Sequence, residues 1–163
     1  TDDNGNQVVL SMHMGSTSVR SLTDLNFYVR HLAQKNDLLI MDEPELNLHP
    51  ENQIKIARFF ARLVNNGIRV FITTHSDYII KELNNLIMLS NDFREKDALI
   101  KKHGYENDEI LKPWQVRVHV AENNTLKPAV VDELGIEADS FEETINNINN
   151  IFDEIYFALQ EDS

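Results

Sequence analysis

The chain of 163 residues contains no cysteine. This absence excludes disulfide bonds and thiolate metal sites, and it agrees with a protein of the reducing cytoplasm. Long apolar runs are also missing, because the longest extend over only a few residues, whereas a membrane-spanning helix needs ~20. We therefore expect a cytoplasmic protein with no membrane span and no signal peptide.

Basic residues are scarce. The chain has 15 Lys and Arg against 27 Asp and Glu, a formal net charge of −12 and a pI of about 4.8. The densest basic cluster, residues 94–103, is diluted by acidic residues. Because long-range attraction to nucleic acid needs a concentrated basic patch, we expect no direct nucleic-acid contact from this chain.

Glycine is rare, and none of the glycines belongs to a G-x-x-x-x-G-K-[ST] phosphate loop. Such a loop holds the β- and γ-phosphates of a nucleotide with backbone N–H groups and a lysine. This chain alone is therefore not expected to bind ATP in the usual way. Its polar start without an initiator methionine predicts that the sequence is part of a longer protein.

The most informative segment that is present is an apolar run, Leu38 to Met41, followed directly by Asp42 and Glu43. A continuous apolar run predicts a strand buried on both faces of a parallel sheet, with the two carboxylates at its carboxyl end. One carboxylate there can hold Mg²⁺ and the other can orient an attacking water. The alternative is that the pair merely ends the strand and caps the following segment.

A second predicted strand, residues 68–74, leads into His75. The carboxyl ends of parallel strands meet at one sheet edge, so this imidazole should lie near the carboxylates. An imidazole can hydrogen-bond a phosphate oxygen or the attacking water. A single histidine is more often an ordinary surface or core residue, but the two strands together favour a nucleotide-hydrolysis site.

A hydroxyl-rich loop precedes a predicted helix over residues 19–34. Free backbone N–H groups at a helix start attract anions, and Arg20 adds positive charge there. An ordinary N-cap at Thr17 or Ser18 is the alternative. The candidate anion-binding residues are Gly15, Ser16, Thr17 and Ser18, and the apolar stripe of the helix is formed by Leu22, Leu25, Val29 and Leu32.

Three segments, GSTSVRSL at 15–22, LLIMDEPELNLHP at 38–50 and FITTHSDYII at 71–80, occur in the order found in the second half of an ABC-type ATPase head. The chain resembles that superfamily over roughly residues 10 to 90. The motif DEPELNLHP, at residues 42–50, resembles that of the soluble AAA-type ATPases of the RecF and OLD-like branch, which includes many bacterial defence and repair proteins. The resemblance identifies the segments as signature motif, Walker B with D-loop, and switch-histidine loop, with the Walker A half missing. The family usually has a glycine where Ser18 or Val19 stands.

The resemblance implies ATP and Mg²⁺ as cofactors, with Asp42 holding the metal, Glu43 positioning the hydrolytic water and His75 contacting the γ-phosphate. It also implies that the loop from Gly15 to Ser18 contacts ATP held by the opposite subunit of a head-to-tail homodimer. Nucleotide-driven closure would then act in DNA repair or phage defence, with an effector or nuclease as a further partner. The alternative is a non-catalytic interaction module that retains the ATPase fold.

The expected fold class is α/β, a P-loop NTPase-like parallel sheet with flanking helices in residues 1–104. Besides the elements above, we expect short strands at 8–14 and 86–89 and helices at 77–84 and 93–103. A further helix should begin at Pro50 and end at Asn65 to Gly67, with one apolar face.

Residues 105–163 are predicted to form a small C-terminal appendage. Alternating residues predict a hairpin of strands 114–120 and 126–131 around Asn123 and Asn124. A capping-box pattern at Ser140 predicts a long helix, which either docks on its own domain or binds a partner. Its heptad seam consists of Phe141, Ile145, Ile148, Phe152, Ile155 and Leu159.

Overall fold

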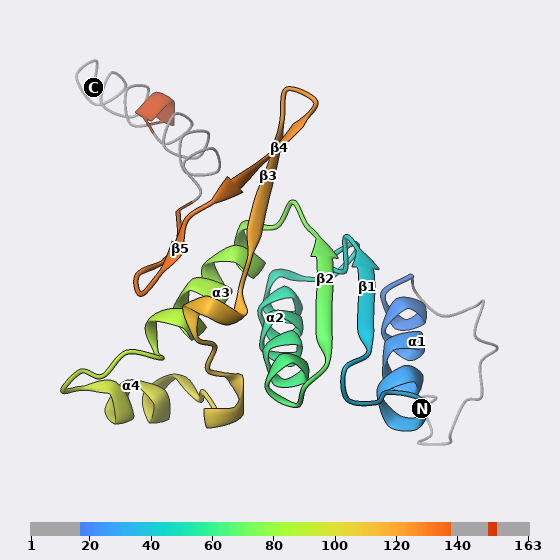
Figure 1. The fold of residues 1–163 in the computed structure, drawn as a ribbon, viewed down its shortest axis with the longest axis horizontal. Helices are drawn as coiled ribbons and strands as arrows, with labels where there is room; N and C mark the ends of the chain where they lie inside the picture. The colour runs from blue at the N-terminus through green and yellow to red at the C-terminus, as the bar shows by residue number, and fades with distance from the viewer. Residues whose placement is uncertain (1–16, 138–149, 153–163) are drawn as a thin grey trace, which may run out of the picture.

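The computed structural model describes residues 17–137 and 150–152. This part of the chain is α/β, with helices and three small two-stranded sheets (Figure 1). The predicted strand at 8–14, Gly15 and Ser16, and most of the helix predicted from Ser140 lie outside the described residues, although 150–152 are helical. The elements are α1 (Thr17–His31), β1 (Leu38–Asp42), α2 (Pro50–Asn65), β2 (Arg69–Thr73), α3 (Asp77–Met88), α4 (Lys96–His103), η2 (Asn107–Glu109), η3 (Pro113–Gln115), β3 (Val118–Glu122), β4 (Thr125–Ala129), β5 (Val131–Asp132) and β6 (Gly135–Ile136).

Strands β1 and β2 are parallel neighbours, as the sequence predicted. Their register runs from Leu38 opposite Arg69 to Asp42 opposite Thr73. The two strands therefore end at the same edge, and the segments that follow them start side by side (Figure 1). Helix α2 connects them, which is the crossover that parallel pairing requires.

Only one face of this sheet is covered by the described residues. Leu39, Met41, Val70 and Ile72 pack against a core to which α1 contributes Leu25 and α2 contributes its apolar side. The opposite face is exposed at Leu38 (50%), Ile40 (65%) and Phe71 (57%). The expectation that the strand at 38–42 is buried on both faces is therefore wrong for the described structure, because α1 and α2 pack on the same side.

Helix α2 confirms the prediction of a helix that begins at Pro50. His49 is its N-cap, with the Nδ1 atom accepting a hydrogen bond from the backbone N–H of Glu51 at 3.4 Å. Pro50 suits the first helical turn because it has no N–H to satisfy there. The helix ends before Gly67, whose φ of +86° is accessible to glycine without steric penalty.

Helix α3 corrects a second expectation. The strand predicted at residues 86–89 is wrong, since the helix that starts at Asp77 continues to Met88. Ile79, Leu83, Leu86 and Ile87 recur at helical spacing, and Leu86 and Ile87 are fully buried in the second core cluster with Ala61 and Leu111. A short apolar run does not distinguish a strand from the last turns of a buried helix.

The predicted hairpin is confirmed by the antiparallel pairing of β3 with β4. Asn123 and Asn124 have φ values of +50° and +58°, which is the backbone of a two-residue type I′ turn, and asparagine tolerates it. The first strand begins at Val118 rather than at residue 114, because Pro113 starts the short helix η3 instead. Similarly, the helix predicted at 93–103 begins at Lys96 and ends before Gly104, at φ +65°.

Among the described helices, none has both the length and the apolar character needed to cross a bilayer.

Candidate functional site

Asp42 and Thr73 end the two parallel strands opposite one another. The Thr73 hydroxyl donates a hydrogen bond to Asp42 Oδ1. The same hydroxyl oxygen accepts a hydrogen bond from the backbone N–H of Glu43 at 3.1 Å, and so does the Thr73 carbonyl oxygen, also at 3.1 Å. Threonine 73 thus holds both the side chain of Asp42 and the backbone of the next residue.

Glu43 has a left-handed backbone conformation, with a φ of +44°. This conformation is unfavourable for a residue with a Cβ atom and persists only where the surroundings enforce it, often at functional sites. Here the enforcing contacts are the two hydrogen bonds from its N–H to Thr73. The turn at Glu43 sends the chain away from the strand direction directly after the first carboxylate.

The side chains of Glu43 and His75 approach each other across the sheet edge. Glu43 Oε1 lies 3.6 Å from His75 Nε2, with exposed side-chain fractions of 34% and 86%. This separation is too long for a direct hydrogen bond, but one water molecule can contact both groups at such a distance. The structure therefore brings Asp42, Glu43 and His75 to one edge, although they come from two loops far apart in sequence.

The predicted anion-binding loop is placed only in part. Thr17 and Ser18 are the first residues of α1, while Gly15 and Ser16 lie outside the described residues. From the stripe predicted for this helix, Leu25 is buried and Val29 packs against the same core. Leu22 and Leu32 are more exposed, at 38% and 57%.

Glu45 and Gln53 were not among the predicted site residues, yet both contact the histidine loop. Glu45 is buried at 9% exposure, and its Oε1 accepts hydrogen bonds from the Thr74 hydroxyl and the His75 backbone N–H. The Ser76 hydroxyl donates to Gln53 Oε1 at 2.5 Å. The only sequence signal for Glu45 was a third acid close to Asp42 and Glu43, and a polar residue within a loop gives no indication of burial.

The donor set at this edge fits a nucleotide-associated Mg²⁺ better than a metal held by protein alone. In the described ranges, no group of three or more His, Cys, Asp or Glu residues is arranged to hold a metal ion. Mg²⁺ commonly binds through one or two carboxylates and completes its coordination with phosphate oxygens and water. Asp42, at the strand end and oriented by Thr73, matches that requirement.

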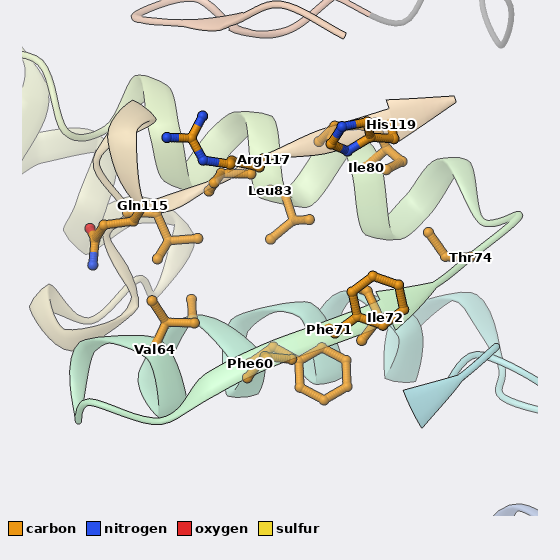
Figure 2. A pocket seen from close by; sticks show the side chains of 15 residues that line it. Phe60, Val64, Phe71, Ile72, Thr74, Ile80, Leu83, Gln115, Arg117 and His119 are labelled. Atoms are coloured by element: carbon orange, nitrogen blue, oxygen red, sulfur yellow. The ribbon is translucent and has the colours of Figure 1, made fainter. Parts of the chain in front are cut away.

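An apolar groove lies beside the other edge of β2, between this strand and β3 (Figure 2). Figure 2 shows Phe60, Val64, Ile72, Ile80 and Leu83 around it, with Thr74 at one end. Gln115, Arg117 and His119 add polar groups to its lining. None of the residues that line it belongs to the carboxylate and imidazole edge, so the groove is a separate feature. In the part of the chain that the structure describes, β2 pairs with β1 alone.

Comparisons with known proteins find matches to parts of the chain. Residues 1–80 match a family model described as an AAA ATPase domain. The chain is 36% identical over 68 residues to the energy-coupling factor transporter ATP-binding protein EcfA2 of Mycoplasma mobile, covering 41% of this chain and 22% of that protein. It is 22% identical over 94 residues to an ABC transporter ATP-binding protein of Listeria monocytogenes, covering 54% of this chain and 35% of that protein.

The chain thus spans about a fifth to a third of the curated relatives that it matches. No solved structure matches it. The chain is thus similar, over part of its length, to an AAA ATPase domain and to ATP-binding proteins of transporters.

Proposed function

We propose that this chain is the C-terminal catalytic portion of an ATP-hydrolysing ABC-type AAA ATPase of the soluble RecF and OLD-like branch. The observation that carries the proposal is the approach of Glu43 Oε1 to within 3.6 Å of His75 Nε2, at the edge where Asp42 ends β1. A Walker B carboxylate pair and a switch histidine must converge in this way to act on one phosphoryl group. Because the motif DEPELNLHP resembles that of a branch with many defence and repair proteins, we also propose a role in DNA repair or phage defence.

In this proposal each residue has a separate task. Asp42, oriented by the Thr73 hydroxyl, would hold the Mg²⁺ that accompanies ATP. That ion, when bound, neutralises charge on the phosphates. Glu43 accepts a hydrogen bond from the attacking water and takes its proton as the water oxygen bonds to the γ-phosphorus. The bond to the β,γ-bridging oxygen breaks, and ADP leaves with that electron pair.

His75 would donate a hydrogen bond to a γ-phosphate oxygen. Its imidazole is 86% exposed, so the nucleotide can reach it from the solvent side of the sheet edge. A donor aimed at an oxygen that gains charge in the transition state lowers the barrier without changing ground-state binding by the same amount. His75 therefore contributes mainly to the rate of the chemical step.

Two further parts of the site would be needed, a phosphate loop and a contact from a second subunit. We propose that a phosphate loop in another segment of a longer protein binds the β- and γ-phosphates. The loop Gly15, Ser16, Thr17 and Ser18 would contact ATP held by the second subunit of a head-to-tail homodimer. The exposed sheet face at Leu38, Ile40 and Phe71 and the open edge of β2 support a larger P-loop-type sheet, because a parallel sheet is normally covered on both faces.

The second candidate is a non-catalytic interaction module that retains the ATPase fold. It is favoured by one observation, the absence of a phosphate loop within the 163 residues. The gene sequence preceding this segment separates the two proposals. A glycine-rich loop ending in Lys-Ser or Lys-Thr supports the ATPase, and its absence supports the module.

The proposed function is tested by Glu43→Gln in the longer protein that carries this sequence together with a phosphate loop. Because the amide is a poor proton acceptor, turnover should fall about 100-fold or more while ATP binding is retained. Glu95→Gln is the matched control, since Glu95 is an exposed residue at the start of α4, which lies apart from the carboxyl ends of β1 and β2 (Figure 1). Unchanged turnover in Glu43→Gln contradicts the assigned role.

A further inference from the structure

We propose that Glu45 is a positioning residue that sets the place of His75 by holding its backbone, and that this tether couples the carboxylate loop to the histidine loop. The expected effect of this tether on ATP turnover rests on the proposed function. The tether itself consists of hydrogen bonds between described residues and does not depend on that function.

One carboxylate oxygen of Glu45 makes both contacts. Oε1 accepts a hydrogen bond from the Thr74 hydroxyl at 2.7 Å and another from the backbone N–H of His75 at 2.8 Å. Glu45 follows β1 and His75 follows β2, and the residues are 30 positions apart in sequence. Hydrogen bonds to a charged acceptor are about twice as strong as those between neutral groups, so this oxygen is a firm link between the loops.

The histidine loop has a second anchor on its other side. Thr74 Oγ1 accepts a hydrogen bond from the Ser76 backbone N–H at 3.0 Å. The Ser76 hydroxyl donates to Gln53 Oε1 at 2.5 Å, and Gln53 Nε2 donates to the Leu48 carbonyl oxygen at 2.9 Å. The three residues of the loop are thus fixed between Glu45 and α2.

The imidazole of His75 depends on this backbone support. Its side chain is 86% exposed, and the ion-pair contact recorded for it is the 3.6 Å approach to Glu43. Packing therefore contributes little to its placement, and the position of its Cα atom decides whether Nε2 lies beside Glu43. A displacement of about 1 Å at such a site can reduce turnover 100-fold.

The second carboxylate oxygen of Glu45 lacks a hydrogen-bond partner among the described residues, which supports a functional reason for a carboxylate here. Glu45 Oε2 is buried and has no hydrogen-bond partner among the described residues. A buried carboxylate with one oxygen unpaired is unfavourable for folding. Departures from the rules of stable packing are expected at functional sites, and this one lies two residues from the left-handed backbone of Glu43.

The tether is tested first without nucleotide, by hydrogen exchange of peptides that cover residues 72–78. Glu45→Leu removes the acceptor, so exchange at His75 should become roughly tenfold faster, the loss expected for one charge-assisted hydrogen bond. Glu45→Gln keeps an acceptor oxygen and should exchange close to the wild-type rate. Glu95→Leu, the same substitution at an exposed position beside α4, should leave this segment unchanged.

The catalytic consequence is tested by ATP turnover in the longer protein. Glu45→Leu should lower kcat ~10- to 100-fold with KM for ATP within about twofold, and Glu45→Gln should restore most of kcat. If Glu45→Leu does not fold, Thr74→Val supplies the test. It removes the hydroxyl that bonds Glu45 and the Ser76 N–H but leaves the bond from the His75 N–H to Glu45, so it should give a smaller loss of kcat.

The possible outcomes separate this proposal from the proposed function. A wild-type protein without ATPase activity overturns the proposed function but leaves the exchange result as a test of the tether. Wild-type exchange at residues 72–78 in Glu45→Leu overturns the tether, whatever the activity. Faster exchange with unchanged kcat overturns the positioning role. A fall in kcat that Glu45→Gln does not relieve also overturns it.

Discussion

The left-handed conformation of Glu43 predicts an unusual response to glycine. At φ +44°, any residue with a Cβ atom is strained by about 1–2 kcal/mol, and glycine is not. Glycine has a larger conformational entropy in the unfolded chain, which lowers the free energy of unfolding by about 0.5–1 kcal/mol and offsets part of this gain. Glu43→Gly should therefore be more stable than Glu43→Ala by about 0.7 kcal/mol, which is ~2 °C in Tm for a domain of this size.

Both substitutions remove the carboxylate, so the comparison isolates the backbone. The side chain of Glu43 has a contact with the exposed His75 at 3.6 Å, and its loss affects both variants equally. Stability is measured by urea unfolding and by calorimetry. Asn36 provides the control, because it also has a positive φ, +71°, and its hydrogen bonds are made by its backbone atoms. Since asparagine tolerates this conformation, Asn36→Gly should change stability less than Glu43→Gly. Equal stability of Glu43→Gly and Glu43→Ala refutes the reasoning.

Two further predictions concern the buried cluster around Glu82, which is 4% exposed and accepts a hydrogen bond from Arg58 Nε at 2.5 Å. Arg58→Met should lower the free energy of unfolding by about 3 kcal/mol, because it leaves a buried carboxylate without its cation. In the double variant, Glu82→Leu removes that carboxylate and should recover most of the loss. If urea unfolding instead shows that the losses of the two single variants add up in the double variant, the prediction is contradicted. Burial, and then the charge of Glu82, raise the pKa of Tyr105 above 10.0. The neutral phenol therefore contributes fully to the free energy of unfolding below pH 10, and this contribution is lost as the pH rises through the raised pKa. Tyr105→Phe should therefore lose less stability than wild type as the pH rises above about 10 in urea unfolding, and an identical decline in both proteins contradicts the assignment.

The elements predicted correctly from sequence are those with a strong local signal. The apolar run before Asp42 indicated β1, and its pairing with β2 followed from the two parallel strands that α2 connects. His49 and Pro50 mark the start of α2, and Asn123 and Asn124 mark the hairpin turn. In each case a pattern of neighbouring residues was enough to predict the element, and the parallel pairing followed from the helix between the two strands.

The errors and omissions depend on contacts between distant residues. Leu86 and Ile87 are compatible with a strand, and only their packing with Ala61 and Leu111 shows why the helix continues through them. The burial of Glu45 arises from hydrogen bonds to Thr74 and His75, which no local pattern encodes. Likewise, the exposed face of β1 depends on which helices cover the sheet, and an apolar run does not report this.

The account of the site depends on Glu43 and His75 acting on one phosphoryl group. The most direct test is a double-mutant cycle on kcat for ATP hydrolysis, with Glu43→Gln, His75→Ala and the double variant in the longer protein. Groups that act on the same transition state are strongly non-additive, so the double variant should be little slower than Glu43→Gln alone. Independent effects, in which the two losses multiply, would contradict a shared site.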